Sequence, residues 1–427
     1  MNVLVYGAAV SGAAAAALAS AQGHRVTVYD QRSDRGLTAK GFQTVVGQFR
    51  DELLTDVDLV ITSPGFPESS RPVVAALAAG VPLVSELEFA AGLLEVPYVA
   101  VTGTNGKTTV TTLVADMLAT SGKRVTAAGN VGTPLSSVVD QDWDVLSIEA
   151  SSFQLRFIER FKPEVAVVLN VAPDHLDWHP SMAAYATAKA RIFENMGSES
   201  LVVYDADDRG ASELVARSSA KVCPVSGTSV PSGGSGYVDG SLVIDGVRFP
   251  TPITTRIHLV DLAAAAVAAL RVGADREAVA SVIEGFDSGA HRREVVAVHE
   301  GLTWVNDSKA TNPHAAVDAA GSYESVVLIA GGRNKSLDLS LLGEVASIRA
   351  AVLIGEAADE LAGILARRTV VRATDMADAV QKAATLGQPG DTVLLAPGCA
   401  SFDMFDDYKQ RGDVFRSTVL DVVGRRG

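Results

Sequence analysis

The chain is poor in cysteine and in positive charge. Cys223 and Cys399 are its only cysteines in 427 residues, which excludes a disulfide framework and fits a reducing cytoplasm. Aspartate and glutamate number 50 against 36 lysines and arginines, for a formal net charge of −14. A chain this acidic is unsuited to nucleic acid or an anionic membrane as its main partner. Its length allows two to three domains, each able to bury a core.

A basic leader is also lacking. Residues 1–23 carry no charged side chain and include an alanine run at 13–17, which resembles the apolar part of a signal peptide. A secretory signal needs lysine or arginine ahead of that part, and none occurs before Arg25. The segment instead divides into a strand, a glycine turn and a helix, so we expect neither a signal nor membrane insertion.

This first segment predicts a nucleotide-binding βαβ unit. Ala9 replaces the middle glycine of the dinucleotide fingerprint, and Asp30 stands where a dinucleotide enzyme holds a ribose. Taken alone, the unit leaves an NAD-linked oxidoreductase and other nucleotide binders as open alternatives. The expected elements are a strand at 2–6, a turn at 7–12, a helix at 13–22 and a strand at 25–29.

The clearest chemical signal is the stretch Gly103-Thr-Asn-Gly-Lys-Thr108, between an apolar strand at 98–101 and a helical pattern at 108–118. A strand, glycine loop and helix in this order direct backbone N–H groups and a positive helix end at one point, where phosphate oxygens bind. Lys107 would reach the terminal phosphates, and the Thr108 hydroxyl would ligate Mg²⁺. Only two residues separate the two glycines, so the loop departs from the usual P-loop spacing. We expect ATP binding.

Two polar residues follow other strands of the same region. Glu149 ends a strand at 145–149, and His175 comes just after a strand at 165–170. Parallel strands that end at one sheet edge would bring both residues to Lys107, which predicts a Mg²⁺–ATP site. Lys189 lies on the helix that follows His175, and taken alone it resembles a solvated surface lysine.

The last third of the chain has three polar or glycine-rich loops, each after a predicted strand: 306–313, 331–336 and 397–402. Loops at the carboxyl ends of neighbouring parallel strands form one ligand-binding edge. The turn Ser63-Pro-Gly65 also follows a strand, whereas 226–240, rich in glycine, serine and proline, suggests a surface loop or hairpin.

The alternation of strands and helices predicts an α/β protein with largely parallel sheets. We expect three domains: a Rossmann-like N-terminal domain, a central P-loop ATPase-type domain with a parallel sheet, and a Rossmann-like C-terminal domain. Their predicted limits are 1–93, 94–288 and 289–427.

Together these motifs resemble the Mur ligases, and the likeness covers essentially the whole chain in the right order. It rests on the glycine loop, Glu149-Ala-Ser-Ser-Phe-Gln-Leu155, Asp174-His175, Lys189 and Asp307-Ser-Lys-Ala-Thr-Asn312, the last being the most specific. The resemblance implies that the three domains bind a UDP-sugar, ATP and the incoming amino acid, respectively.

Site residues follow from this resemblance, position by position. It implies that the UDP-substrate contacts Ser11, Asp30, Ser63, Pro64 and Gly65. It implies ATP contacts at Gly103, Thr104, Asn105, Gly106, Lys107, Thr108, Thr109, Arg292 and Asp307. It implies a D-glutamate pocket at Thr311, Lys335, Ser401, Phe402 and Tyr408. It implies metal ligands at Thr108, Glu149, His175 and Lys189, with Lys189 carbamylated, and catalytic roles for Lys107, Asn130, His175 and Lys189.

The activity implied is an ATP-dependent ligation in cytoplasmic peptidoglycan precursor synthesis, by an enzyme expected to be a monomer. ATP, with about two Mg²⁺ ions, would convert the carboxylate of UDP-N-acetylmuramoyl-L-alanine into an acyl phosphate, which the amine of D-glutamate then attacks. Either His175 or the phosphate itself would take the proton of the amine. One departure concerns the adenine contacts: the family has His-Asn-x-x-Asn where this chain has His258-Leu-Val-Asp-Leu262.

Three other functions are compatible with parts of this sequence. An oxidoreductase would leave the phosphate loop unexplained. A non-catalytic nucleotide-binding protein would account for the change at Leu259. A sibling ligase that adds a different amino acid, as folylpolyglutamate synthase does, would share most of the motifs.

Overall fold

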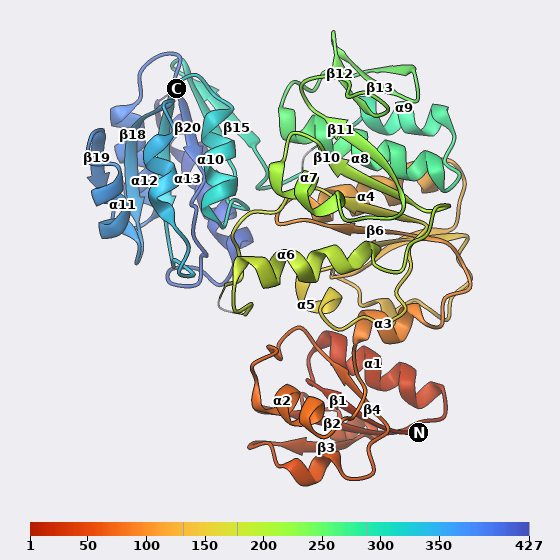
Figure 1. Ribbon diagram of the computed structural model, residues 1–427. Coiled ribbons are helices and arrows are strands. Elements are labelled where there is room, and N and C mark those ends of the chain that lie inside the picture. Colours follow the sequence, from red (N-terminus) through yellow and green to blue (C-terminus); the bar gives the residue numbers. More distant parts are fainter. Residues whose placement is uncertain (131, 177, 288, 427) are drawn as a thin grey trace. The chain divides into compact units, whose positions relative to one another are not determined.

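The computed structural model describes residues 1–130, 132–176, 178–287 and 289–426 (Figure 1). It divides into two compact units. The first comprises Met1–Val171 and Trp178–Phe286, and the second comprises the described residues within 172–177 and 287–427. Residues 288 and 427, at limits of the predicted domains, lie outside the described residues. In the part of the chain that is described, no helix is both long and apolar enough to cross a membrane.

The first unit opens with a five-stranded sheet in the order β3-β2-β1-β4-β5, in which every neighbouring pair is parallel. The first helix begins at Val10, so the predicted start at Ala13 is wrong. A Cβ on Gly12 would come within 1.8 Å of the carbonyl oxygen of Gly7, and only glycine lets the helix pack this closely on the turn. The elements are β1 (Asn2–Tyr6), α1 (Val10–Ala21), β2 (Arg25–Asp30), η1 (Thr38–Lys40), β3 (Gln43–Val46), η2 (Asp51–Leu54), β4 (Leu59–Thr62), α2 (Arg71–Ala78), β5 (Leu83–Ser85) and α3 (Glu86–Ala91).

A nine-stranded sheet forms the rest of the first unit, in the order β14-β13-β12-β11-β10-β9-β6-β8-β7. Strands β6 to β12 are parallel, and β13 and β14 add an antiparallel edge. The stretch 226–240 contributes β12, one arm of a hairpin. The strands are β6 (Tyr98–Thr102), β7 (Val125–Gly129), β8 (Val145–Glu149), β9 (Val165–Val168), β10 (Leu201–Asp205), β11 (Lys221–Ser226), β12 (Ser235–Val238), β13 (Ser241–Ile244) and β14 (Val247–Pro250).

Helices cover both faces of this sheet, so its strands are apolar on both sides. In Figure 1, α4 and α8 lie on one side of β6, with α5 and α6 on the other. Helix α8 carries the alanine-rich run, whose small side chains let it pack tightly against α4. The helices are α4 (Lys107–Thr120), η3 (Leu135–Ser137), α5 (Ser152–Leu155), α6 (Met182–Ala190), η4 (Arg191–Phe193), α7 (Arg209–Val215), α8 (Arg256–Arg271) and α9 (Arg276–Glu284).

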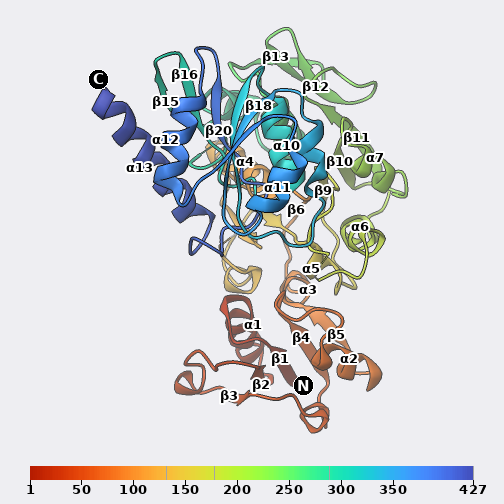
Figure 2. The same ribbon diagram turned by 90° about the vertical axis from the view of Figure 1, so that its left-hand side faces the viewer.

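The second unit has a six-stranded sheet in the order β15-β16-β20-β17-β18-β19. Only β15 runs antiparallel to its neighbour, and Figure 2 shows α13 passing beside it. Its elements are β15 (Glu294–His299), β16 (Leu302–Asn306), α10 (Pro313–Gly321), β17 (Val326–Gly331), η5 (Leu339–Glu344), β18 (Ile348–Ile354), α11 (Ala358–Ile364), β19 (Thr369–Arg372), α12 (Met376–Leu386), β20 (Thr392–Leu395) and α13 (Tyr408–Arg426).

The three sheets confirm the predicted α/β class with three largely parallel sheets. Sequence patterns missed the edge strands β3, β15 and β19, because none of the three contains a buried residue; in β15, Val295 and Val298 are exposed. The predicted strand at 145–149 is found with the same limits.

Candidate active site

The phosphate loop joins β6 to the N-terminus of α4, and Asn170 holds its shape. The backbone N–H of Thr104 donates to the carbonyl of Asn170 (2.9 Å), and that of Asn105 donates to the Asn170 side chain (2.7 Å). Gly106 caps α4 with a φ of +84°, where a Cβ would lie 2.8 Å from a carboxylate oxygen of Asp261. The loop is therefore fixed by its neighbours, as a preformed anion site requires.

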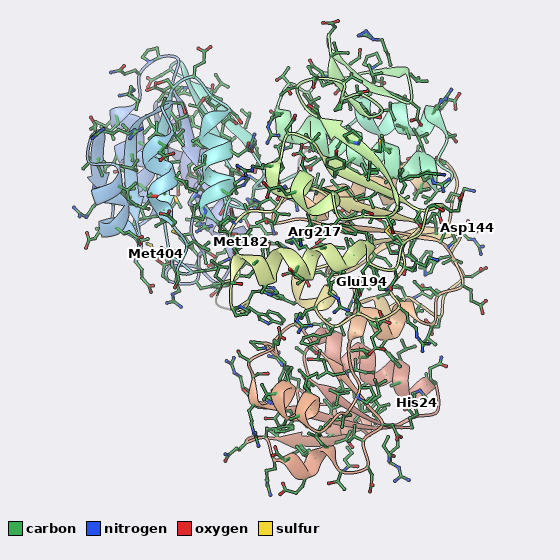
Figure 3. All side chains as sticks on the ribbon, in the orientation of Figure 1. His24, Asp144, Met182, Glu194, Arg217 and Met404 are labelled. Carbon is green, nitrogen blue, oxygen red and sulfur yellow. The ribbon has the colours of Figure 1, made fainter. Side chains whose placement is uncertain are left out.

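Two lysines converge on this loop. The Lys107 ammonium donates to the carbonyl oxygens of Gly103 and Thr104, both at 2.9 Å. The Lys189 ammonium donates to the same Gly103 oxygen at 2.6 Å and lies 4.6 Å from the ring centre of Tyr185. Lys189 is only 1% exposed and belongs to α6, the helix that starts at Met182 in Figure 3. Two cations at one carbonyl create a local positive potential that is suited to binding a polyphosphate.

Oxygen donors gather beside the lysines, around Glu149 at the end of β8. The Thr108 hydroxyl donates to one carboxylate oxygen of Glu149, and the Asn130 amide to the other, each at 2.7 Å. Among the described residues, no three histidine, cysteine, aspartate or glutamate side chains form a metal-holding group. A carboxylate and a hydroxyl next to a phosphate loop fit Mg²⁺, which takes few protein ligands and fills its shell with water and phosphate oxygens.

A second glycine turn, between β1 and α1, is built around Asp30. Its carboxylate accepts from the backbone N–H groups of Ala8 (2.9 Å), Arg32 (2.8 Å) and Ser33 (3.3 Å). Burial pushes the pKa of Asp30 upward, but these N–H donors outweigh it and hold the pKa below its usual value. Asp30 is therefore an anion that still has oxygen lone pairs to offer.

The residues predicted around this turn come close together. A Cβ on Gly7 would meet the hydroxyl of Ser63 at 2.8 Å, and that buried hydroxyl has no hydrogen-bond partner among the described residues. Ser11 lies in the first turn of α1, and the Pro64 carbonyl accepts from the indole of Trp178 at 3.1 Å. Gly65 follows in the same turn after β4.

In the second unit, Asp307 and its arginine neighbours form a buried ionic group. The Arg293 guanidinium lies 3.8 Å from Asp307 and 2.5 Å from Asp318. Burial raises the pKa of Asp307 to about 6, although Arg293 and Arg292 act in the opposite direction. Sequence motifs drew attention to Arg292 and missed Arg293, because a sequence does not show that Arg293 reaches both Asp307 and Asp318.

Asp174 and His175 belong to the second unit, where Asp174 connects two predicted glutamate loops. Its carboxylate accepts hydrogen bonds from the Lys335 ammonium and the Asn312 amide, each at 3.4 Å. His175 has a φ of +54°, and its ring lies 3.7 Å from the same carboxylate. The meeting of His175 with Lys107 and Glu149 concerns two separate units and stays a prediction.

The other predicted glutamate residues lie in the loops that follow β16 and β20 or at the start of α13. Ser401 is buried, Thr311 is partly buried and Phe402 is 64% exposed. The ring of Tyr408 has the Lys309 ammonium 4.0 Å from its centre. These loops form one edge of the second unit, as strand order requires.

Arg411 is a buried residue that sequence motifs did not reveal. Its guanidinium donates to the hydroxyl and carbonyl of Ser308 (3.0 and 2.8 Å) and to the carbonyl of Cys399 (3.1 Å). It therefore ties α13 to two of the polar loops. Burial lowers the pKa of Arg411 to about 10, which still leaves it charged at neutral pH. An arginine inside a helical pattern gives no sequence signal for such a role.

The departure at the start of α8 also has a structural explanation. Leu259 has no polar side-chain atom and is buried in the core of the nine-stranded sheet, so it contributes packing in place of a polar contact. Asp261 lies beside Gly106, and the ring of His258 packs edge-on against Phe286, with 5.4 Å between ring centres.

Models of three protein-family domains match the chain in order. Residues 1–85 match the "Mur ligase MurD-like, N-terminal domain", residues 101–236 the "Mur ligase middle domain", and residues 291–399 the "Mur ligase, glutamate ligase domain".

Curated relatives match along nearly their whole length. A protein of Frankia casuarinae named UDP-N-acetylmuramoylalanine–D-glutamate ligase is 43% identical over 98% of this chain and 94% of its own. Proteins of the same name from Geobacter metallireducens and Mycolicibacterium smegmatis are each 37% identical, over 98% and 99% of this chain and 97% of their own.

Solved structures share the fold at lower identity. A pseudomurein peptide ligase type C from Methanothermus fervidus superposes with a TM-score of 0.63 at 16% identity, covering 99% of this chain and 100% of its own. The MurF ligase of Thermotoga maritima, solved in complex with ADP, gives a TM-score of 0.60 at 17% identity over 94% and 96%.

Proposed function

Because this chain belongs to the Mur ligase family, we propose that it is the ligase that joins D-glutamate to UDP-N-acetylmuramoyl-L-alanine with conversion of ATP to ADP and phosphate, in peptidoglycan precursor synthesis. The names of the full-length relatives support this substrate pair. The observation that carries the chemistry is the convergence of Lys107 and Lys189 on the Gly103 carbonyl, next to the Thr108–Glu149 pair.

The reaction has two balanced steps. In the first, a carboxylate oxygen of the alanyl group attacks the γ-phosphorus of ATP, which forms an acyl phosphate and releases ADP. In the second, the amine of D-glutamate attacks the acyl carbon, phosphate leaves with the bonding electrons, and the amine loses a proton. Lys107 and the N-terminus of α4 hold and stabilise the charge that develops on the transferring phosphoryl group. Either His175 or the departing phosphate accepts the proton of the amine.

Mg²⁺, about two ions in all, would be held by Thr108, Glu149, His175 and carbamylated Lys189. When bound, Mg²⁺ supplies charge neutralisation for the phosphate oxygens. Conversion of the Lys189 ammonium to a carbamate would replace its donation to Gly103 by an anionic oxygen ligand. Incubation with ¹³C-bicarbonate should give one carbamate carbon signal that is absent from Lys189→Ala.

The predicted domains at 1–93, 94–288 and 289–427 serve in this proposal as UDP-sugar, ATP and amino-acid domains. The D-glutamate pocket consists of Thr311, Lys335, Ser401, Phe402 and Tyr408. We place the enzyme in the cytoplasm as a monomer; sedimentation equilibrium at micromolar concentration should give the mass of one chain.

The direct test is phosphate release from ATP with UDP-N-acetylmuramoyl-L-alanine as acceptor. D-glutamate should support turnover, whereas L-glutamate and L-lysine should not, and NADH should not be oxidised. Activity with L-lysine instead would identify a sibling ligase, and no phosphate release with any amino acid would identify a non-catalytic nucleotide binder.

The glutamate pocket has its own test. Lys335→Ala removes the cation that faces Asp174, and it should raise the KM for D-glutamate about tenfold or more while the KM for ATP stays within twofold. Lys409→Ala, an exposed lysine of α13, provides the control.

A further inference from the structure

Two buried aromatic residues without a predicted role, Trp178 and His179, lie between two of the predicted substrate sites. Both belong to the first unit, as do the UDP-sugar turn at 63–65 and the phosphate loop. Trp178 is 8% exposed and His179 is 1% exposed. Side chains this well packed transmit displacement, because a close-packed interior does not deform continuously.

Trp178 contacts the UDP-sugar side. Its indole N–H donates to the carbonyl of Pro64 at 3.1 Å. The ring belongs to the same hydrophobic cluster as Tyr6 and Tyr29 of the five-stranded sheet, and it packs edge-on against Phe157. A shift of the turn at 63–65 would therefore move this ring.

His179 passes the contact onward in two directions. Its ring centre lies 4.4 Å from that of Trp178 and 5.3 Å from that of Tyr185. Its Nε2 lies 2.9 Å from the hydroxyl of Ser152, three residues after Glu149. The histidine thus joins the segment that follows β8 to helix α6.

Tyr185 completes the connection to the phosphate loop. Its hydroxyl lies 3.1 Å from the hydroxyl of Thr104, and its ring faces the Lys189 ammonium, which donates to Gly103. From Pro64 to Gly103, each neighbour is therefore in hydrogen-bond or ring contact with the next.

We propose that Trp178 and His179 are positioning residues that couple binding of the UDP-substrate at 63–65 to the arrangement of the phosphate loop, through Tyr185. This inference rests on the proposed function, because it assumes a UDP-sugar at the first site and ATP at the second. The coupling should tighten nucleotide binding once the UDP-substrate is bound, by a factor of about five or more, as is usual for coupled sites.

The test measures binding without turnover. Calorimetry gives the Kd of adenylyl imidodiphosphate with Mg²⁺, in the absence and presence of saturating UDP-N-acetylmuramoyl-L-alanine. Trp178→Phe keeps an aromatic ring and removes the donor to Pro64. Trp143→Phe is a matched control that makes the same change in the same unit. The Trp143 indole N–H donates to the Val138 carbonyl at 2.9 Å, and this hydrogen bond lies away from both sites.

Wild type and Trp143→Phe should show at least a fivefold fall in the nucleotide Kd, and Trp178→Phe less than a twofold fall with each ligand still bound singly. Full coupling in Trp178→Phe, equal loss in Trp143→Phe, or no coupling in wild type would overturn the inference. If Trp178→Phe does not fold, His179→Phe, which removes the contact with Ser152, is measured in the same way. A wild type that binds neither ligand would contradict the proposed function itself.

Discussion

The first unit contains two strand–glycine turn–helix motifs with the same backbone plan and different chemistry. Gly7 (φ +102°) precedes α1, and Gly106 (φ +84°) precedes α4; neither helix has an acidic residue in its first turn or a side-chain cap. Local backbone geometry therefore provides a similar positive helix end in both places.

The surrounding side chains make the difference. At the first turn, the Asp30 carboxylate accepts the hydrogen bond of the Ala8 N–H. A negative side chain at this position is better suited to bind the hydroxyl groups of a sugar than a phosphate. At the phosphate loop, Lys107 brings a positive charge to the carbonyls of Gly103 and Thr104, and Lys189 reaches the same Gly103 oxygen from α6. A shared loop shape therefore sets where a nucleotide can bind, and the side chains around the loop set which part of it binds.

The largest expected effect is that of Lys107→Ala, which removes the charge that distinguishes the second turn from the first. Turnover should fall about 10³-fold, because the ammonium stabilises charge that develops on the transferring phosphoryl group. Phosphate release with D-glutamate is the measurement, with Lys123→Ala, an exposed lysine beyond the end of α4, as control. Near-normal turnover would remove Lys107 from the site.

Lys189→Ala should reduce turnover about 10²-fold or more, because it removes the buried second cation or the carbamate formed from it. Acetate should partly restore the rate if a carboxylate can fill the vacated ligand position. An active variant with no response to acetate would argue for a structural lysine only.

Each glycine turn should respond to alanine with loss of its own ligand. Gly106→Ala places a methyl group 2.8 Å from Asp261 and Leu169 and should weaken ATP binding, whereas Gly7→Ala meets Ser63 and should weaken UDP-substrate binding. Each strained site should cost about 1–3 kcal/mol of stability.

Gly122→Ala and Gly23→Ala are matched controls. They follow α4 and α1, have positive φ and no atom within 4 Å of the added Cβ. Equal loss of ATP affinity in Gly122→Ala would show that strain alone, and not the shape of the phosphate loop, explains the effect.

Asp30→Ala should raise the Kd of the UDP-substrate about tenfold and leave that of ATP within twofold, because it removes the carboxylate of the first turn only. Calorimetry with each ligand separately measures both values. If ATP affinity fell equally, the two turns would not be independent.

The smallest expected effect is on stability against pH. The pKa of Asp30 lies below its ordinary value of 3.8, so its contribution to stability is present above pH 3.8 and is lost as pH falls through the lowered pKa. The difference in unfolding free energy between wild type and Asp30→Asn should therefore shrink below about pH 4. A constant difference from pH 3 to 6 would mean that the native N–H donors do not shift this group.

The order of the elements, the conformation of most of them and the glycine turns follow from the amino-acid sequence alone. Buried strands with apolar runs, such as 145–149, and turns with glycine after them encode their own conformation through burial and backbone freedom. The order of the motifs also indicated the family that the full-length relatives support.

Which side chains meet depends on the tertiary structure. The contacts of Asn170 with the phosphate loop, of Trp178 with Pro64 and of Arg411 with Ser308 join residues 65 to 114 positions apart. Nothing in the local periodicity of a helix or strand specifies such partners, because they depend on how sheets and helices pack. For the same reason the edge strand β15, held by pairing with β16 and by packing against α13, was missed.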